Sequence, residues 1–269
     1  MSVITISSGA FSGGKLLAEC LASRLRFRCI DRDTVVEKAS TYGVSPNDLR
    51  QAFLMHSGSV ERFHHQRYLY LALIQAALAE EVRTGRVVYF GNAGHLLLKA
   101  DAAILRVRAI APLDFRIRMA QDQLKLSTKE VIWYIRKRDR EMQRWIHYLY
   151  GVDWNDPALY DLVVNLDQMD VKQTCRLVAI TAKSRCFEFN PQYQAAMDDL
   201  ALASRVRANL ALDPATSRLE LQLVARSGIL TIQGRLACAG EIGEIERVAS
   251  AVSGLRGLNL DQLALAAPA

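Results

Sequence analysis

The chain has 269 residues, of which 51% are hydrophobic and 23% charged, and it carries a formal net charge of +6. This composition excludes disordered and collagen-like chains, and the length favours one larger domain with a smaller one attached. The five cysteines are scattered without a C-x-x-C pair, which argues against a disulfide framework or a zinc site. The longest apolar run, Leu69–Ala79, is too short to cross a bilayer, and the first residues lack a signal-peptide pattern. We therefore expect a cytoplasmic protein.

The first 186 residues alternate short apolar runs with segments of helical apolar spacing. Strands are predicted at Val3–Ile6, Arg28–Ile30, Val87–Phe90, Ala103–Ile110 and Asp161–Asn165. Helices are predicted at Lys15–Leu25, Arg67–Val82, Leu113–Leu124, Thr128–Tyr150 and Val171–Lys183. Strands separated by helices imply a parallel sheet covered on both faces, so the predicted fold class is α/β.

A glycine-rich loop lies between the first predicted strand and the first predicted helix. Gly9, Gly14 and Lys15 meet the pattern G-x-x-x-x-G-K, although Leu16 stands where a Ser or Thr would bind magnesium. Glycines let backbone N–H groups approach phosphate oxygens, and the helix N-terminus adds partial positive charge. The alternative is a glycine-rich turn that only feeds a helix, but the register of strand, loop, lysine and helix favours a phosphate-binding loop.

Most of the positive charge lies in one segment. Residues 106–140 hold ten Lys or Arg against four acidic residues, whereas residues 197–269 have a net charge of −1. Concentrated arginine can bind phosphate oxygens in bidentate fashion, but a basic helix face can also be merely solvated. Nucleic-acid binding by this segment is a third possibility, and its signature would be an affinity that falls steeply with salt.

Several phrases of the sequence resemble the cytidylate kinase-like family of P-loop nucleoside monophosphate kinases. The most specific is the phrase YGVDWNDPALYDLVVN at 150–165. The others are Ile4–Ser7, Ser12–Gly14, Asp31–Asp33 and Val88–Gly91. The resemblance covers roughly residues 1–185 and implies a three-layer P-loop kinase fold. It also implies transfer of the γ-phosphoryl group of ATP, with Mg²⁺, to a nucleotide acceptor.

The resemblance also implies roles for individual residues. The donor phosphates would be cradled by Gly9, Ser12, Gly13, Gly14 and Lys15. The acceptor side would involve Asp31, Asp33 and Arg62, and Ser12 with Asp31 would be the candidates to hold the metal. An arginine-rich segment would neutralise the transferring phosphoryl group and, with Lys15, form the catalytic set: Arg136, Arg138, Arg140 and Arg144. Asp139 would orient these arginines.

The chain departs from the family pattern at several positions. Members commonly carry an Arg where this chain has Ser8, a Gly where it has Phe11, and a G-R-G-like phrase where it has Asn92. A charged hydrogen bond to an anionic substrate contributes about 1.5–3 kcal/mol, so each missing arginine would weaken binding roughly ten- to a hundredfold. Lys15, in contrast, restores a lysine that many relatives replace with Arg.

The last part of the chain has a different pattern. A helix is predicted from about Asp198 to Leu212, then strict alternation at Leu219–Val224 and a hairpin turn at Arg226–Gly228. A strand at Ile229–Ile232, a helix at about 239–252 and a strand at 255–263 complete an αββαβ order. This order and the glycines at 228, 234 and 254 resemble a BON domain, a family associated with phospholipid surfaces or protein partners.

The predicted organisation is a kinase-like domain at 1–186, a linker at 187–195, a BON-like domain at 196–264 and a tail at 265–269. The first functional hypothesis is a cytidylate-type nucleotide kinase, with no specific nucleic-acid partner. Its BON-like domain would bind a protein partner or membrane surface, or support a homo-oligomer. The alternative hypothesis is a catalytically weak nucleotide-binding switch that signals through that domain. The loss of an arginine at Ser8 and the residues Asn92 and Leu16 support the alternative, whereas Lys15 and the arginine segment support the kinase.

Overall fold

The computed structural model describes residues 3–52, 64–91, 93–98, 104–188 and 190–265. Within these ranges, helices and strands alternate through the first 165 residues and a smaller unit follows. No helix within the same ranges is both long and apolar enough to cross a membrane. Arg62 and Asn92, which the sequence analysis singled out, lie outside the described residues.

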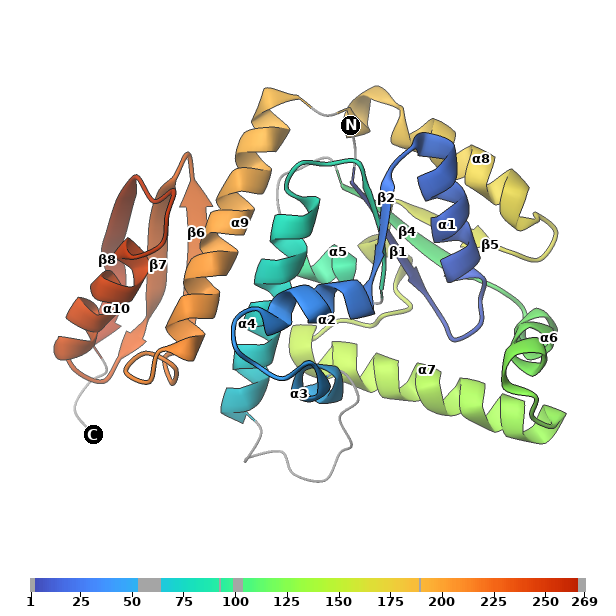
Figure 1. The fold of residues 1–269 in the computed structure, drawn as a ribbon, viewed down its shortest axis with the longest axis horizontal. Helices are drawn as coiled ribbons and strands as arrows, with labels where there is room; N and C mark the ends of the chain where they lie inside the picture. The colour runs from blue at the N-terminus through green and yellow to red at the C-terminus, as the bar shows by residue number, and fades with distance from the viewer. Residues whose placement is uncertain (1–2, 53–63, 92, 99–103, 189, 266–269) are drawn as a thin grey trace.

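A five-stranded parallel sheet forms the centre of the first part, with the strand order β2-β3-β1-β4-β5. Its strands are β1 (Val3–Ser8), β2 (Arg28–Asp31), β3 (Val87–Phe90), β4 (Ile104–Ile110) and β5 (Leu162–Asn165). Because β1 is the middle strand and is fully buried, it can only be built from small polar or apolar residues. The α/β class and the parallel sheet are confirmed (Figure 1).

Helices cover both faces of this sheet. The helices of this part of the chain are α1 (Gly14–Leu25), α2 (Arg32–Ser40), α3 (Pro46–Ala52), α4 (His64–Val82), α5 (Gly94–Leu97), α6 (Leu113–Leu124), α7 (Thr128–Tyr150) and α8 (Val171–Ala182), with short 3₁₀ turns at Pro157–Leu159 and Arg185–Phe187. The sequence analysis did not anticipate α2, α3 and α5. Each of these three has nine or fewer residues, too few for a clear apolar period.

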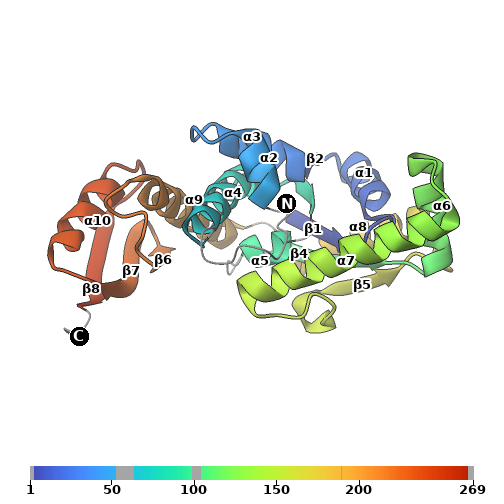
Figure 2. The ribbon, with the colours of Figure 1, turned by 90° about the horizontal axis from the view of Figure 1, so that it is seen from below.

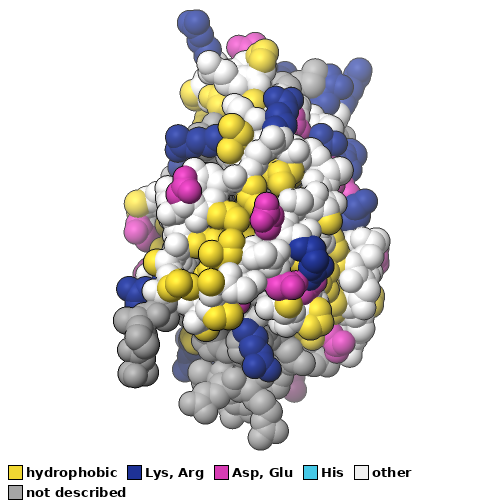
Figure 3. All heavy atoms as spheres, turned by 90° about the vertical axis from the view of Figure 1, so that its left-hand side faces the viewer, with side chains coloured by type: hydrophobic (Ala, Val, Ile, Leu, Met, Phe, Trp, Pro, Cys, Tyr) yellow, Lys and Arg dark blue, Asp and Glu magenta, His cyan; other side chains and the backbone are white. Residues whose placement is uncertain are grey.

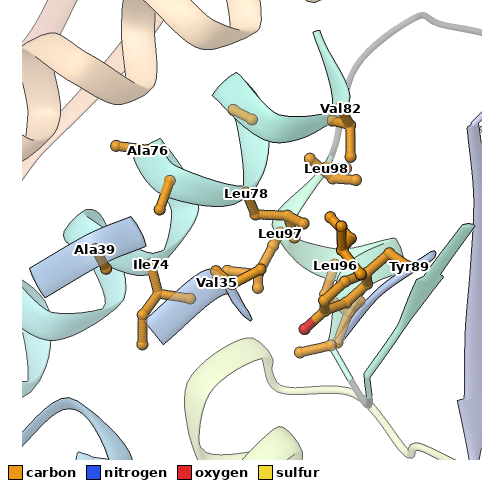
Figure 4. Packing of buried hydrophobic residues seen from close by; sticks show 14 of the residues in the cluster. Val35, Ala39, Ile74, Ala76, Leu78, Val82, Tyr89, Leu96, Leu97 and Leu98 are labelled. Atoms are coloured by element: carbon orange, nitrogen blue, oxygen red, sulfur yellow. The ribbon is translucent and has the colours of Figure 1, made fainter. Parts of the chain in front are cut away.

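Two apolar layers hold the sheet between its helices. On one face, Leu17 and Leu21 of α1 and Val178 of α8 pack against β1 and β4. On the other, residues of α2, α4 and α5 surround Tyr89 of β3, with Leu78 wholly buried (Figure 4). Together these layers give the three-layer arrangement of a P-loop kinase fold.

The helices α6 and α7 form a hairpin beside the carboxyl ends of the strands. Ala120, Val131 and Ile135 form a small apolar cluster between the two helices. A capping box at Ser127 and Glu130 starts α7, and Gly151 ends it in the left-handed conformation at φ 66°. The hairpin is therefore a well-bounded unit that faces the glycine-rich loop.

The predicted linker is helical over half of its length. Helix α9 (Pro191–Leu212) begins seven residues before the position that apolar spacing indicates. Asn190 caps it by accepting a hydrogen bond from the Tyr193 N–H, and Pro191 occupies the first turn, where a missing N–H costs nothing. Pro191 thus starts a helix rather than marking a linker, and the stretch before it is short.

The C-terminal unit has the predicted αββαβ order. After α9 come β6 (Leu221–Arg226), β7 (Ile229–Leu236), α10 (Gly240–Ser250) and β8 (Gly257–Leu265). β7 is the middle strand, antiparallel to β6 and parallel to β8. Figure 2 shows this small sheet at one end of the molecule, with α9 and α10 on the same side of it. The second, smaller domain that the sequence indicates is therefore present as a separate sheet.

Helix α9 belongs to two apolar cores at once. Met197, Ala201 and Ala208 pack in the core around α4, whereas Leu202 and Val206 pack against the small sheet. Arg83, at the end of α4, bonds to Asp198 and reinforces the contact. The C-terminal unit therefore packs along α4 through helix α9.

Candidate functional site

The glycine-rich loop has the geometry of a phosphate cradle. It leaves the end of β1 at Ser8 and enters α1 at Gly14, with Gly13 at φ 78°. A Cβ on Gly13 would lie 2.6 Å from Leu166, and one on Gly14 would lie 2.9 Å from Phe90, so side chains are excluded at both positions. Within the loop, the Ala10 and Ser12 N–H groups already donate to Asp139 Oδ1 and to the Gly9 carbonyl. The N–H groups of the first turn of α1 are therefore the ones that can bind an anion.

A cavity of about 410 Å³ opens over this loop. Its lining includes the loop with Ser12 and Lys15, and Arg138 and Met142 of α7. Asp31 and Asp33 also line it. The structure therefore brings together these predicted donor-side and acceptor-side residues: Gly9, Ser12, Gly13, Gly14, Lys15, Asp31, Asp33 and Arg138.

The four predicted arginines of α7 do not share one face. Arg138 lines the cavity and lies 3.5 Å from Glu141. Arg136, Arg140 and Arg144 follow one another at intervals of four residues, which places them on the same side of the helix, where they are exposed. Their assigned role remains a prediction, and only Arg138 is positioned next to the loop in this arrangement.

Asp139 connects the hairpin of α6 and α7 to the loop. Its Oδ1 accepts a hydrogen bond from the Ala10 N–H at 2.9 Å, and its Oδ2 accepts one from Arg116 at 2.6 Å. Arg116 also donates from Nε to the Ala10 carbonyl at 2.7 Å. Asp139 thus contacts a different arginine, on α6, from the ones it was expected to orient.

Phe11 gives the loop a second contact with the hairpin. Its φ of 58° is in the left-handed region, where a glycine, the residue that the family pattern implies here, would be unstrained. The ring packs into the small apolar cluster between α6 and α7, 6.1 Å from the ring of Tyr134. A phenylalanine at this position lacks the backbone freedom of a glycine, but its ring gains an apolar contact with the hairpin of α6 and α7.

Asp31 caps α2 and faces the loop lysine. Its carboxylate accepts hydrogen bonds from the backbone N–H and the hydroxyl of Thr34. Burial alone would raise the pKa of Asp31, but the Thr34 hydrogen bonds and the charge of Lys15 hold it below its ordinary value. Asp33, two residues further, pairs with Arg50 at 3.2 Å. Both carboxylates are fixed in place, and Asp31 is ionised at neutral pH.

The long phrase at 150–165 builds a support behind the loop. The buried Trp154 donates from its indole N–H to Ser7 Oγ at 2.8 Å, and the Tyr160 hydroxyl donates to the Trp154 carbonyl. Asn155 accepts a hydrogen bond from the buried Arg108. The specificity of this phrase therefore has a physical basis, since its residues hold the end of β1 from which the loop starts.

Polyphosphate fits this site better than a metal ion held by the protein alone. No group of three or more His, Cys, Asp or Glu side chains suited to a metal ion occurs in the described part of the chain. Leu16 is 41% exposed and offers no oxygen, whereas the Ser12 hydroxyl and Asp31 line the cavity. A magnesium ion here would take its ligands chiefly from phosphate and water, as this ion commonly does.

Sequence reasoning missed Arg108 and Arg116 as site residues. Both were counted only as part of the basic segment. What places them is the pairing of β4 with β1, because residues in β4 and at the start of α6 then reach the edge where the loop begins. Strand order is not written in local sequence patterns, although an arginine inside the apolar run at 104–110 was a usable signal.

Known proteins share this arrangement over the first part of the chain. Residues 3–168 match the model of the Cytidylate kinase-like family. A cytidylate kinase from Ignicoccus hospitalis is 32% identical over 168 residues, which are 61% of this chain and 90% of that protein. A cytidylate kinase from Pyrococcus horikoshii is 26% identical over 165 residues, 61% of this chain and 79% of that protein.

One solved structure shows the same fold. An uncharacterized protein from Eubacterium ventriosum aligns with a TM-score of 0.56 at 14% identity, over 69% of this chain and 100% of that one. The three-layer architecture of the first part is thus found in a distantly related sequence.

Proposed function

This chain belongs to the cytidylate kinase-like family, and from that premise we propose that it is a nucleotide kinase. It would transfer the γ-phosphoryl group of ATP to a nucleoside monophosphate, with CMP as the first acceptor to test because the relatives above are cytidylate kinases. The observation that carries the proposal is one cavity lined by the phosphate loop, by Lys15 and by Arg138.

The geometry supports catalysis by positioning and charge. The N–H groups at the start of α1 and Lys15 would hold the donor phosphates, and Arg138, which lines the same cavity, would neutralise charge on the phosphoryl group. Ser12 and Asp31, which both line the cavity, are the residues that would hold a magnesium ion, whose role would be to neutralise phosphate charge. The other three arginines of α7 are on its exposed side. To neutralise the phosphoryl group together with Arg138, their side chains would have to extend around the helix: Arg136, Arg140 and Arg144.

The proposed binding site for the acceptor monophosphate is supported by fewer contacts among the described residues. Asp33 and Arg62 are the proposed acceptor residues together with Asp31, and Asp33 already pairs with Arg50. Ser8 is buried at the end of β1, so it offers no long cationic side chain to a monophosphate. This favours a second candidate, a nucleotide-binding switch with weak catalysis. Its loop would bind nucleotide without efficient transfer.

For the C-terminal unit we propose a BON-like role in association, over residues 196–264, with the kinase unit at 1–186. The αββαβ order supports this assignment. Apolar side chains gather on the side of the molecule that carries α10 and β8, and Leu265 is 57% exposed (Figure 3). The unit has a net charge of −1, which favours a protein partner or a second copy over an anionic phospholipid surface. Because ATP is the proposed donor, we also propose a cytoplasmic location for the protein.

A coupled assay of ADP release tests the kinase proposal. Purified protein with ATP and magnesium is offered CMP, dCMP, UMP, AMP or GMP in turn. We expect a rate that depends on one monophosphate and falls about a hundredfold or more in Lys15→Ala, because a preorganised phosphate contact is lost. The exposed Lys172 on α8 supplies a matched control, and Lys172→Ala should keep the rate.

The same samples separate the two candidate functions. ATP binding by calorimetry without transfer to any monophosphate would favour the switch over the kinase. Absence of ATP binding in the unmodified chain would contradict both.

A further inference from the structure

A buried arginine lies directly behind the phosphate loop. Arg108 of β4 is 6% exposed, less than almost any other charged side chain in the described part of the molecule. It donates from Nη1 to Ser7 Oγ at 3.4 Å and from Nη2 to Asn155 Oδ1 at 3.0 Å. Both acceptors are neutral, and no carboxylate of the described residues forms a salt bridge with it.

Aromatic rings enclose the guanidinium. Its Cζ lies 3.7 Å from the centre of the Trp154 ring and 5.6 Å from that of Tyr160. Ring faces attract a cation, but much less strongly than a carboxylate at hydrogen-bond distance. Burial lowers the pKa of Arg108 from its ordinary value, although an arginine keeps its proton throughout the accessible pH range. The fold therefore holds a permanent positive charge without a full counter-charge.

Such a charge is costly to the folded protein. Neutral hydrogen bonds and ring contacts offset the loss of water only in part, and apolar replacements of buried charges often stabilise a fold. A charge that persists despite this cost calls for a partner that the chain alone does not supply. The partner must be an anion, and it must bind where Arg108 can act on it.

The phosphate cavity is the place that fits. Arg108 pairs in register with Ser7, two residues before the loop begins at Gly9. Trp154 both stacks on the guanidinium and lines the cavity. The negative charge of Asp139, which contacts the loop, already favours the charged form of Arg108, whereas the positive charge of Arg116 opposes it. A multiply charged anion in the cavity would act on Arg108 in the same direction as Asp139, with greater strength.

We propose that Arg108 is a positioning residue for the donor polyphosphate, and that the bound polyphosphate is the counter-charge the fold lacks. Arg108 acts through its field and through Ser7, not by direct contact with the reacting atoms. This inference rests on the proposed nucleotide-binding function and adds to it a buried cation behind the loop. It also explains why the sequence places a tryptophan, an asparagine and a tyrosine of one phrase around a single arginine.

Charge removal at Arg108 should therefore have opposite effects on folding and on binding. Arg108→Met keeps most of the side-chain length and removes the charge. We expect the ligand-free protein to unfold at the same or a higher temperature than the unmodified chain. The affinity for ATP, and for inorganic tripolyphosphate as a probe without a base, should fall about tenfold or more.

Two further variants define the control. Arg108→Lys keeps the charge and should restore polyphosphate affinity to within a few-fold of the unmodified chain. Arg106 lies two residues earlier on the same strand and pairs with Asp161 at 2.6 Å, with a side chain 41% exposed. Arg106→Met should therefore leave tripolyphosphate affinity unchanged. If Arg108→Met fails to fold, Arg108→Gln carries the same comparison, because its amide can still hydrogen-bond to Ser7 or Asn155.

The measurements are unfolding temperature without ligand and calorimetric affinity for tripolyphosphate, ATP and CMP. A lower unfolding temperature with unchanged polyphosphate affinity would overturn the proposal and make Arg108 a structural stacking residue. An equal loss for CMP and tripolyphosphate would also overturn it, because the effect would not be specific to the donor phosphates. If the unmodified chain binds neither ATP nor tripolyphosphate, the proposed function fails together with this inference.

Discussion

Charged side chains are buried more deeply at the carboxyl edge of the large sheet than in the C-terminal unit. At the sheet edge, Arg108 is 6% exposed and the Arg116 side chain, paired with Asp139, is 14% exposed. In the C-terminal unit the core is apolar, and Arg247, which pairs with Asp213, is 56% exposed. Burial of charge costs free energy, so charges that serve only solubility stay outside. The contrast separates the part for which we propose anion binding from a part built by apolar packing.

The largest expected effect tests the apolar half of this contrast. Leu230 of β7 is fully buried in the core of the C-terminal unit. Leu230→Ala should lower the free energy of unfolding by about 2–5 kcal/mol, through lost apolar burial and the remaining cavity. Urea unfolding measures this loss. Nucleotide affinity under native conditions should not change.

The control and the contrary outcome are both informative. Val224 is 49% exposed on the neighbouring strand β6, and Val224→Ala should change the unfolding free energy little. If Leu230→Ala weakens ATP binding under conditions where the protein stays folded, the two regions are coupled in function. Helix α9, which contributes to both cores, would be the route, and the switch hypothesis would gain support.

A smaller effect is expected where charge is buried at the loop. Asp139→Asn keeps the shape of the side chain but removes the ion pair with Arg116, while an amide oxygen can still accept from the Ala10 N–H. We expect kcat/KM for phosphoryl transfer to fall roughly ten- to a hundredfold, which corresponds to a charged hydrogen bond of about 1.5–3 kcal/mol. The coupled assay described above measures it.

Asp122 on α6 offers a matched control, because it is exposed. Asp122→Asn should keep the activity. Tighter ATP binding in Asp139→Asn, with kcat unchanged, would instead show that the carboxylate competes with phosphate for the Ala10 N–H.

These two regions also differ in how far sequence alone predicts them. Strict alternation over Leu219–Val224 and the turn at Gly228 were enough to place the hairpin of the C-terminal unit. The start of α9 was misplaced because Pro191 carries two opposite meanings, a break in a chain and a first helical residue. Local patterns describe apolar surfaces well, since one face of each element must be buried.

At the sheet edge, local patterns predicted the loop but not its surroundings. The motif located Gly14 and Lys15, and the predicted strand before it and helix after it placed the loop between them. Arg108 and Arg116 depend on which strand lies beside β1, and Asp139 depends on how a helix hairpin folds back. The phrase at 150–165 was identified by resemblance, but its reason became visible only from its hydrogen bonds.

The smallest expected effect concerns an exposed ion pair of the kinase unit, and it appears as a pH dependence. Burial alone would raise the pKa of Asp161, but hydrogen bonds from the Arg106 side chain and backbone lower it on balance. A carboxyl with a lowered folded-state pKa stabilises the fold above its unfolded-state pKa, and this contribution is lost as the pH falls through the folded-state pKa. Asp161→Asn should therefore reduce the unfolding free energy fully near pH 7. The difference from the unmodified chain should begin to shrink at about pH 4, near the unfolded-state pKa of an aspartate, and should vanish only below the folded-state pKa, which is lower.

Urea unfolding between pH 7 and pH 3 gives the measurement, and Asp213→Asn in the C-terminal unit is its counterpart. The pKa of Asp213 is also lowered, by hydrogen bonds from Arg247 and the Ala215 N–H, so the sign is the same. The effect should be smaller, because Arg247 keeps Glu244 as a partner at 2.8 Å, whereas Arg106 has no second carboxylate among the described residues. An equal or larger loss in Asp213→Asn would contradict the contrast between the two regions, since the C-terminal unit would then depend on charge as much as the kinase unit does.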